Sequence, residues 1–172
     1  AFSVIEQNLF VFFSLFSFII CYVCLIDKNK KKQESLALRK LALSDEILMK
    51  VEKPARYIGN ELNSIVKDKD SVDIRIAMCF PDVYEIGMSH LGIQILYDMF
   101  NKREDTWCER VYSPWSDLHQ IMKEENIPLF GLESQEPIKD FDFLGITIQY
   151  EMCYTNILQV LDLAQIPLLA KD

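Results

Sequence analysis

The sequence lacks every motif that would make a catalytic site on its own. It contains no G-x-G-x-x-G, no Walker loop, no serine-centred elbow and no H-E-x-x-H. Without such a motif, the residues of this chain form no self-sufficient catalytic constellation. They do not establish that this part of the protein is itself an enzyme.

Positive charge is also scarce. The chain has 18 Lys and Arg residues against 26 Asp and Glu residues, which gives a net charge of -8 and a pI of about 4.8. A basic face for nucleic-acid phosphates is therefore not expected. The five cysteines are odd in number and scattered, unlike the disulfide framework of a small secreted domain. We therefore predict a cytoplasmic, reducing environment for the globular part.

An apolar run without a charge extends from Leu9 to Ile26. As a helix it would be roughly 27 Å long, close to the ~30 Å hydrocarbon core of a bilayer. Lysines follow the run, whereas only Glu6 precedes it, so the positive-inside rule places the later chain in the cytoplasm. We predict an apolar N-terminal helix over 9–26, within a leader and Lys-rich linker of residues 1–42. This run is either an inner-membrane anchor or the product of a mis-set start.

Residues 43–71 form the approach to the main domain. Ser44 followed by two acids is typical of a helix start, and Pro54 ends regular structure, so we expect a short helix and then an irregular segment. Residues 72–172 alternate between strand and helix patterns. They predict an α/β domain with a Rossmann-like, open, mostly parallel sheet and flanking helices. The expected strands are 72–80, 107–112, 129–132 and 142–149, and the expected helices begin near residues 89, 116 and 155.

Two further patterns concern the expected helices. The first helix carries a set of apolar residues at helical spacing that we expect to pack on the sheet: Met88, Leu91, Ile95, Leu96, Met99 and Phe100. The other two helices both exit into Ile-Pro-Leu, at 127–129 and 166–168, in keeping with a β-α-β rhythm. Because the second copy reaches the end of the chain, we expect a domain truncated at its C-terminus.

Polar residues gather where the strand 72–80 ends. Phe80 to Gly92 reads F-P-D-V-Y-E-I-G-M-S-H-L-G, and loops at the carboxyl ends of parallel strands line a crevice in open α/β sheets. Free N–H groups at the next helix start suit an anionic or amide-bearing ligand. The end of the strand 142–149 would lie beside this loop. The candidate cofactor-binding residues are Pro81, Asp82, Tyr84, Glu85, Gly87, Ser89, His90, Gly92, Tyr150 and Glu151.

These candidates also have a purely structural interpretation. Asp82 and Glu85 fit solvated loop acids, and His90 fits a residue that caps or packs a helix start. Strand-to-helix turn chemistry accounts for residues 149–156 as well. Cys21 and Cys24 have the spacing of a redox or metal pair, but within an apolar run they are better interpreted as small apolar residues. No metal site is predicted.

Five motifs follow one another in a fixed order along the chain: K-P-A-R-Y-I-G-N-E-L-N-S, F-P-D-V-Y-E-I-G-M-S-H-L-G-I-Q-I-L-Y, V-Y-S-P-W, I-P-L-F-G-L-E-S and I-T-I-Q-Y-E-M-C-Y-T-N-I-L. Together they closely resemble a radical SAM family whose members have a B12-binding-like N-terminal domain. The resemblance covers about Leu43 to Asp172 and leaves residues 1–42 outside.

The resemblance implies a cobalamin-binding domain followed by a radical SAM barrel. Such a barrel holds a 4Fe–4S cluster on C-x-x-x-C-x-x-C and cleaves S-adenosylmethionine. This sequence has no such cysteine triad. The cluster and S-adenosylmethionine would therefore belong to a missing C-terminal part, and the partner would be the barrel of the same full-length radical SAM enzyme.

The cobalamin signature D-x-H-x-x-G is not matched around His90, because Met88 and Ile93 stand where it has Asp and Gly. The resemblance therefore implies a cobalamin-binding-like accessory domain, which either binds cobalamin without a histidine ligand or is degenerate and binds nothing. The alternative is a non-catalytic scaffold or docking module whose crevice is vestigial.

Overall fold

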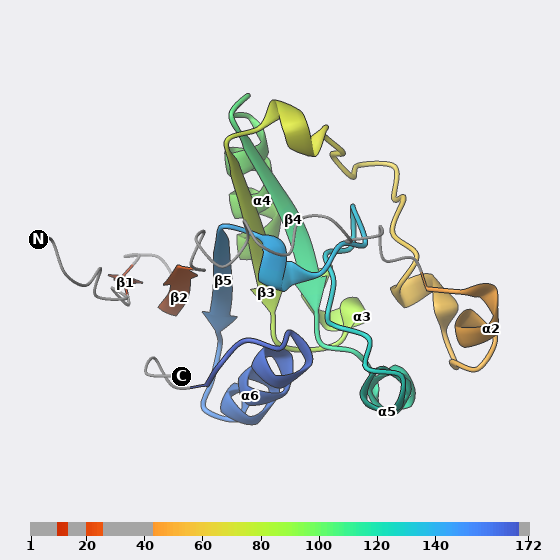
Figure 1. Cartoon of the computed structure of the whole chain (residues 1–172). Coiled ribbons are helices and arrows are strands. Elements are labelled where there is room, and N and C mark those ends of the chain that lie inside the picture. Colours follow the sequence, from red (N-terminus) through yellow and green to blue (C-terminus); the bar gives the residue numbers. More distant parts are fainter. Residues whose placement is uncertain (1–9, 14–19, 26–42, 169–172) are drawn as a thin grey trace, which may run out of the picture.

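β3 (Ile74–Phe80) is the central strand of the parallel sheet. It pairs with β4 (Thr106–Tyr112) on one side and with β5 (Phe143–Ile148) on the other, both in parallel. The computed structural model describes residues 10–13, 20–25 and 43–168, and the parallel strands lie in the last of these ranges (Figure 1). The predicted α/β class, with an open parallel sheet and flanking helices, is confirmed.

The two faces of β3 carry different side chains because successive residues of a strand point to opposite sides. Met78 and Phe80 pack against α4 (Leu91–Asn101). The intervening side chains of β3 belong to a larger core that includes α5 (Ser116–Glu124) and α6 (Cys153–Leu163). Helices therefore cover both faces of the sheet, and in Figure 1 α4 lies behind it.

The chain leaves β3 toward one side of the sheet and later returns to the other side. The strand order β5-β3-β4 means that α4 connects β3 to β4 over one face, and α5 precedes β5 on the other face. The direction of winding therefore changes between the carboxyl ends of β3 and β5. Open α/β sheets hold their ligands at such a switch point, and the predicted site residues lie in the segments that follow β3 and β5.

Two further strands extend the sheet beyond β5. β2 (Ile20–Leu25) pairs antiparallel with β5, and β1 (Phe10–Phe13) pairs antiparallel with β2. The sequence predicts a helix over 9–26, whereas its described parts are strands, in keeping with the strand preference of Phe, Val, Ile and Tyr. The rest of that run lies outside the described residues. Among the described helices, none combines the length and the apolar character needed to cross a membrane.

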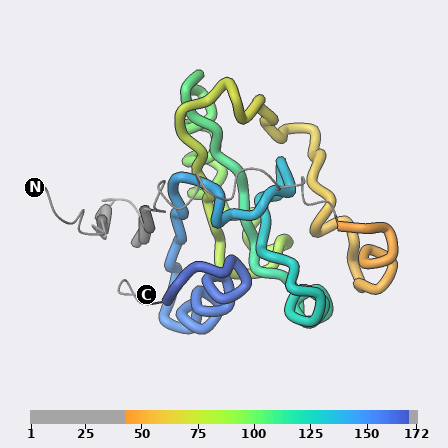
Figure 2. The backbone as a smooth tube through the Cα atoms, in the orientation of Figure 1, coloured from red at the N-terminus to blue at the C-terminus, as the bar shows by residue number. Residues whose placement is uncertain are grey.

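The approach segment packs against the α/β body. It begins with α2 (Asp45–Leu48), and the predicted cap at Ser44 is confirmed, since its Oγ accepts a hydrogen bond from the Ile47 N–H at 3.4 Å. Two short 3-10 helices follow, at Pro54–Arg56 and Lys69–Ser71. Figure 2 shows the segment running from beside α5 to the start of β3. Its buried apolar residues join the core of α5 and α6: Leu43, Ile47, Val51 and Tyr57.

The predicted strand at 129–132 is wrong. In this segment the structure has a single bridge, between Phe130 and Pro137, and no regular strand. The Leu132 N–H donates to the Arg110 carbonyl at 2.8 Å, so the segment covers the outer edge of β4. A Cβ on Gly131 would lie 2.6 Å from Glu109 Oε2, so this close approach to β4 requires glycine. The close approach of Gly131 to the buried Glu109 carboxylate, rather than strand pairing, thus determines the path of this segment.

The predicted inner face of the first helix is wrong in part. The buried residues of α4 are Ile93, Tyr97 and Asn101. Leu91 and Ile95, which the sequence places against the sheet, are 72% and 56% exposed. Met88 and Met99 are exposed as well, while Leu96 and Phe100 are partly buried. Because apolar residues occur around most of this helix, their spacing does not distinguish the buried face.

Two predicted helix boundaries need small corrections, while the predicted helix exits are confirmed. The N-cap of α5 is Trp115 rather than Ser116, and α6 begins at Cys153, two residues early. Asn126 and Gln165 follow α5 and α6 and have φ angles of 55° and 57°, the left-handed conformation that ends many helices. Ile-Pro-Leu comes next in both copies. The Leu129 N–H of the first copy donates to the carbonyl of Leu163, at the end of α6.

Candidate functional site

The predicted site lies where the three parallel strands end. Two hydrogen bonds join the loops that follow these strands. The Ser113 N–H, just after β4, donates to the Asp82 carbonyl at 2.9 Å. Asn156 of α6 donates from Nδ2 to the Pro81 carbonyl at 2.8 Å. The loop after β3 is therefore bonded both to the residue after β4 and to α6. Pro81, at the start of this loop, is buried.

Asp82 and Tyr150 lie in the segments that follow the neighbouring strands β3 and β5. Tyr150 follows β5, and the neighbouring Cys153 thiol and the Asp82 carboxylate both raise the pKa of its phenol. Asp82 also accepts a hydrogen bond from the Val83 N–H at 2.7 Å, which fixes its carboxylate at the loop. Glu151 lies next to Tyr150 and is exposed. These residues supply two carboxylates and one phenol.

Tyr84 points away from this surface. Its hydroxyl donates to Glu61 Oε1 at 2.5 Å, and its ring meets the edge of the Tyr112 ring with centroids 5.4 Å apart. Burial, together with the Glu61 carboxylate, raises the pKa of Tyr84 to about 12. Tyr84 therefore ties α3 (Tyr84–Gly87) to the approach segment and to β4.

Glu85 also faces the approach segment. Its Oε1 lies 2.8 Å from Arg56 Nη2 and 3.4 Å from Lys53 Nζ. The hydrogen bond from Arg56 lowers the pKa of Glu85. Asp82 and Glu85 therefore belong to different surroundings, and only Asp82 faces the switch point.

Gly87 and Ser89 serve packing and local hydrogen bonding. A Cβ on Gly87 would lie 2.5 Å from the Tyr112 ring and 3.1 Å from the Cβ of Phe80, so α3 can approach β4 only because this residue is glycine. Ser89 Oγ donates to the Ile86 carbonyl at 2.9 Å. Gly92 is half-buried in the first turn of α4.

His90 caps α4. Its Nδ1 accepts a hydrogen bond from the Ile93 N–H at 3.3 Å, and its ring lies 5.1 Å from the Phe80 ring. An Nδ1 that accepts must be unprotonated, so the proton of the neutral imidazole is on Nε2. The structural interpretation of His90 given above is therefore the one that the geometry supports.

Six exposed apolar side chains lie in the connections that follow β3 and β5. On the side of β3 and α4 they are Ile86, Met88 and Leu91, and on the side of β5 and α6 they are Tyr150, Met152 and Tyr154. We call these six residues the edge patch. Large exposed apolar groups gathered at one place are typical of a surface that contacts a ligand or another domain.

A buried ion-pair network lies beside the site and was missed from the sequence. Arg110 of β4 bonds Glu61 Oε2 through Nη1 at 2.6 Å and Glu133 Oε1 through Nε at 2.7 Å. The side chains of Arg110 and Glu133 are only 4% and 1% exposed. Burial raises the pKa of Glu133 despite its bonds to Arg110. The one sequence signal is an arginine in the middle of a strand that is otherwise mostly apolar.

A second network lies on the opposite face of β4. Arg75 bonds Glu109 and Glu136, both at 2.6 Å, and its guanidinium lies 4.1 Å from the centre of the Phe141 ring. The Ser134 N–H donates to Glu109 at 2.8 Å. Glu133 of the motif I-P-L-F-G-L-E-S and the following Glu136 thus fix the segment after α5 onto the sheet. Their role is structural.

Metal-binding chemistry finds no support in the part of the chain that the structure describes. No group of three or more His, Cys, Asp or Glu side chains is arranged there to hold a metal ion. Cys79 and Cys108 are buried free thiols, and burial raises the pKa of both. A thiol kept protonated in this way is a poor nucleophile and a poor ligand.

Comparison with known proteins gives one match. Residues 92–172 match the family model described as "Radical SAM proteins, N-terminal". The matched region begins in α4 and includes β4, α5, β5 and α6, whereas the loop at 81–90 precedes it. No curated protein and no solved structure matches the chain. The match agrees with the radical SAM resemblance of the sequence, and it carries no information on cobalamin.

Proposed function

We propose that this chain is a non-catalytic N-terminal accessory domain of a radical SAM protein. We further propose that it docks through the edge patch onto the catalytic domain of the same protein. The match of residues 92–172 to an N-terminal family model supports the first part. In this proposal the 4Fe–4S cluster and S-adenosylmethionine belong to the catalytic domain and not to this chain.

The observation that carries the docking proposal is the edge patch itself. Its six side chains come from two connections that meet at the switch point, and each is at least 40% exposed. Domain interfaces within one protein bury surfaces of mixed apolar and polar character. The edge patch offers such a mixture, with Asp82 and Glu151 beside its apolar groups. A surface of this kind fits another folded domain better than it fits bulk water.

Cobalamin ligated by a histidine does not fit this surface. His90 is the histidine nearest the switch point, but its Nδ1 is engaged in the α4 cap and its Nε2 carries the proton. Metal-bound histidine instead needs a deprotonated nitrogen that is free to bind. A cobalamin held here would have to bind without an axial histidine, through the edge patch alone.

A spectroscopic titration tests the cofactor part of the proposal. We expect hydroxocobalamin added to the 172-residue chain to show no band shift of histidine ligation. Retention on gel filtration without a band shift would support a cofactor held without histidine. A band shift that the His90→Ala variant abolishes would contradict the assignment of His90 as a cap.

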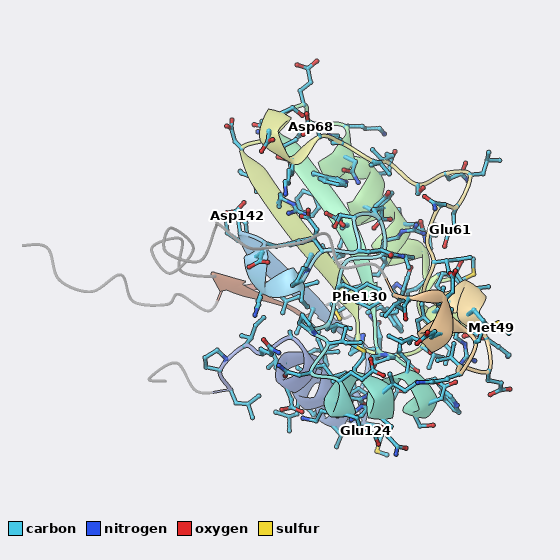
Figure 3. The ribbon with its side chains drawn as sticks, turned by 45° about the vertical axis from the view of Figure 1, so that its right-hand side comes forward. Met49, Glu61, Asp68, Glu124, Phe130 and Asp142 are labelled. Carbon is cyan, nitrogen blue, oxygen red and sulfur yellow. The ribbon has the colours of Figure 1, made fainter. Side chains whose placement is uncertain are left out.

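A binding experiment tests the docking part. The catalytic domain of the complete protein, expressed separately, should capture this chain in a pull-down. Met152→Glu and Leu91→Glu place charge in the edge patch and should reduce capture at least tenfold. Met49→Glu is the matched control, because Met49, labelled in Figure 3, is 85% exposed directly after α2 and belongs to the approach segment rather than to the edge patch. Equal capture of all three variants would contradict docking through the edge patch.

A further inference from the structure

A small cavity lies along the outer edge of β4, apart from the edge patch. Its volume is about 20 Å³. Polar walls come from the approach segment and from β4, and apolar walls come from α5 and the segment after it. The lining residues used below are Arg56, Tyr57, Arg110, Tyr112, Leu118 and Met122. Figure 3 labels Phe130, another lining residue, over the lower half of β4.

Three buried polar atoms of the lining residues have no hydrogen-bond partner within the described residues. They are Arg56 Nη1, Arg110 Nη2 and Tyr112 Oη. The other nitrogens of both guanidinium groups are occupied, since Arg56 bonds Glu85, and Arg110 bonds Glu61 and Glu133. The Arg110 side chain is almost fully buried. An unsatisfied buried donor costs about 1–3 kcal/mol, so an acceptor in the cavity that these residues line would stabilise the chain.

The polar groups around the cavity are mainly donors. Each guanidinium offers N–H groups, and the phenol of Tyr112 can donate or accept. Tyr57 Oη accepts from the Trp115 N–H at 3.2 Å, which leaves its own proton to donate. A ligand that satisfies this lining must therefore present oxygen lone pairs.

Charge and size limit the ligand further. The two guanidinium groups already face three carboxylates, those of Glu61, Glu85 and Glu133. An added anion would leave negative charge uncompensated near the buried Glu133, whereas a neutral oxygen adds none. A water needs roughly 10–15 Å³ of such space and two to four polar partners, and this cavity supplies both.

We propose that this cavity is a binding site for one ordered water molecule. The water accepts hydrogen bonds from Arg56 and Arg110 and exchanges one with Tyr112. The water thereby joins Arg56 of the approach segment to β4. Within the described residues, no direct hydrogen bond links Arg56 to β4. The site is independent of the proposed function, because its residues lie outside the edge patch.

A crystal structure of the 172-residue chain gives the direct test. We expect density for a single water within hydrogen-bond distance of Arg110 Nη2 and Tyr112 Oη. A dry cavity, or a guanidinium turned to a protein partner, would overturn the proposal.

Tyr112→Phe gives a second test whose sign distinguishes the outcomes. If the hydroxyl binds a water, its removal lowers the urea midpoint of unfolding. If the hydroxyl is unsatisfied, its removal raises the midpoint, because a buried polar group without a partner is lost. Tyr154→Phe is the control, since that tyrosine is half-exposed on α6 and its change should leave the midpoint unaltered.

A salt titration separates water from an anion. At constant ionic strength, chloride is exchanged for gluconate, which is too large to enter the cavity. We expect no change in the urea midpoint of the chain. A saturable rise with chloride, absent from Arg56→Gln, would show an anion site and contradict the neutral ligand.

Discussion

The outer edge of β4 and the carboxyl edge of the sheet are built in opposite ways. At the outer edge of β4, charged groups are buried and paired: Arg110 with Glu61 and Glu133. At the carboxyl edge, large apolar side chains are exposed. Buried charge must be matched inside the chain, whereas exposed apolar surface is available for a contact from outside. The first edge therefore depends on ion pairs within the chain, and the second presents apolar surface to its surroundings.

The largest effect is expected when the buried ion pairs at the outer edge of β4 are broken. Arg110→Met leaves the Glu133 carboxylate buried without its cation, so we expect the free energy of unfolding to fall by about 3–5 kcal/mol. Urea denaturation measures this loss. Arg103→Met is the control, because Arg103 pairs with Asp105 at the surface, and its loss should be far smaller. Equal losses in the two variants would remove the distinction between buried and surface pairs.

A smaller effect is expected where the two edges join. Gly87→Ala pushes a methyl group against the Tyr112 ring, and overpacking of this kind costs about 1–3 kcal/mol. Thermal unfolding followed by circular dichroism would measure it. Ser89→Ala removes only an exposed local hydrogen bond and should cost far less. A Gly87→Ala variant as stable as the parent would mean that α3 does not pack on β4 as described.

The pH dependence of stability sharpens the comparison. Burial opposes ionisation of Glu61, but hydrogen bonds from Tyr84 and Arg110 outweigh it and lower its pKa below 4.5. A lowered folded pKa adds stability above the unfolded value, and this stability is lost as pH falls through the folded value. Below about pH 4.5, Glu61→Gln should therefore lose less stability than the parent chain does. Parallel curves of unfolding free energy against pH would contradict this role of Glu61.

The smallest effect is expected at the carboxyl edge. Met152→Gln and Leu91→Gln change exposed side chains, so each should alter the unfolding free energy by no more than about 0.5 kcal/mol. The same changes should weaken capture by the catalytic domain. A loss of stability comparable to that of Gly87→Ala would show that these side chains are packed within the chain itself.

Sequence patterns predicted the elements better than their contacts. Strand β3 and the loop at 81–90 follow from local alternation and from Pro and Gly signals, so they were found. The inner face of α4 was not found, because Leu91, Ile93 and Ile95 are equally apolar and only the sheet decides between them. Likewise, Glu61 lies far along the chain from Arg110, and no local pattern links them.

The arrangement of the strand ends could be predicted, but the surroundings of the individual candidate residues could not. The segments that carry Asp82 and Tyr150 follow neighbouring parallel strands, whose ends must lie together. Tyr84 and Glu85 lie in the same loop, yet a single turn of helix directs them toward the approach segment. His90 was recognised from the sequence both as a ligand-facing residue and as a cap, and only the Ile93 N–H distinguishes the two.

The central place of β3 also has a consequence for synthesis on the ribosome. β3 leaves the ribosome before both of its parallel neighbours, and its second edge stays open until Phe143 to Ile148 have been made. An open strand edge is a template for pairing with another chain. During that interval the nascent protein depends on α4 and β4 to cover one side of β3, and on fast synthesis or a chaperone to protect the other.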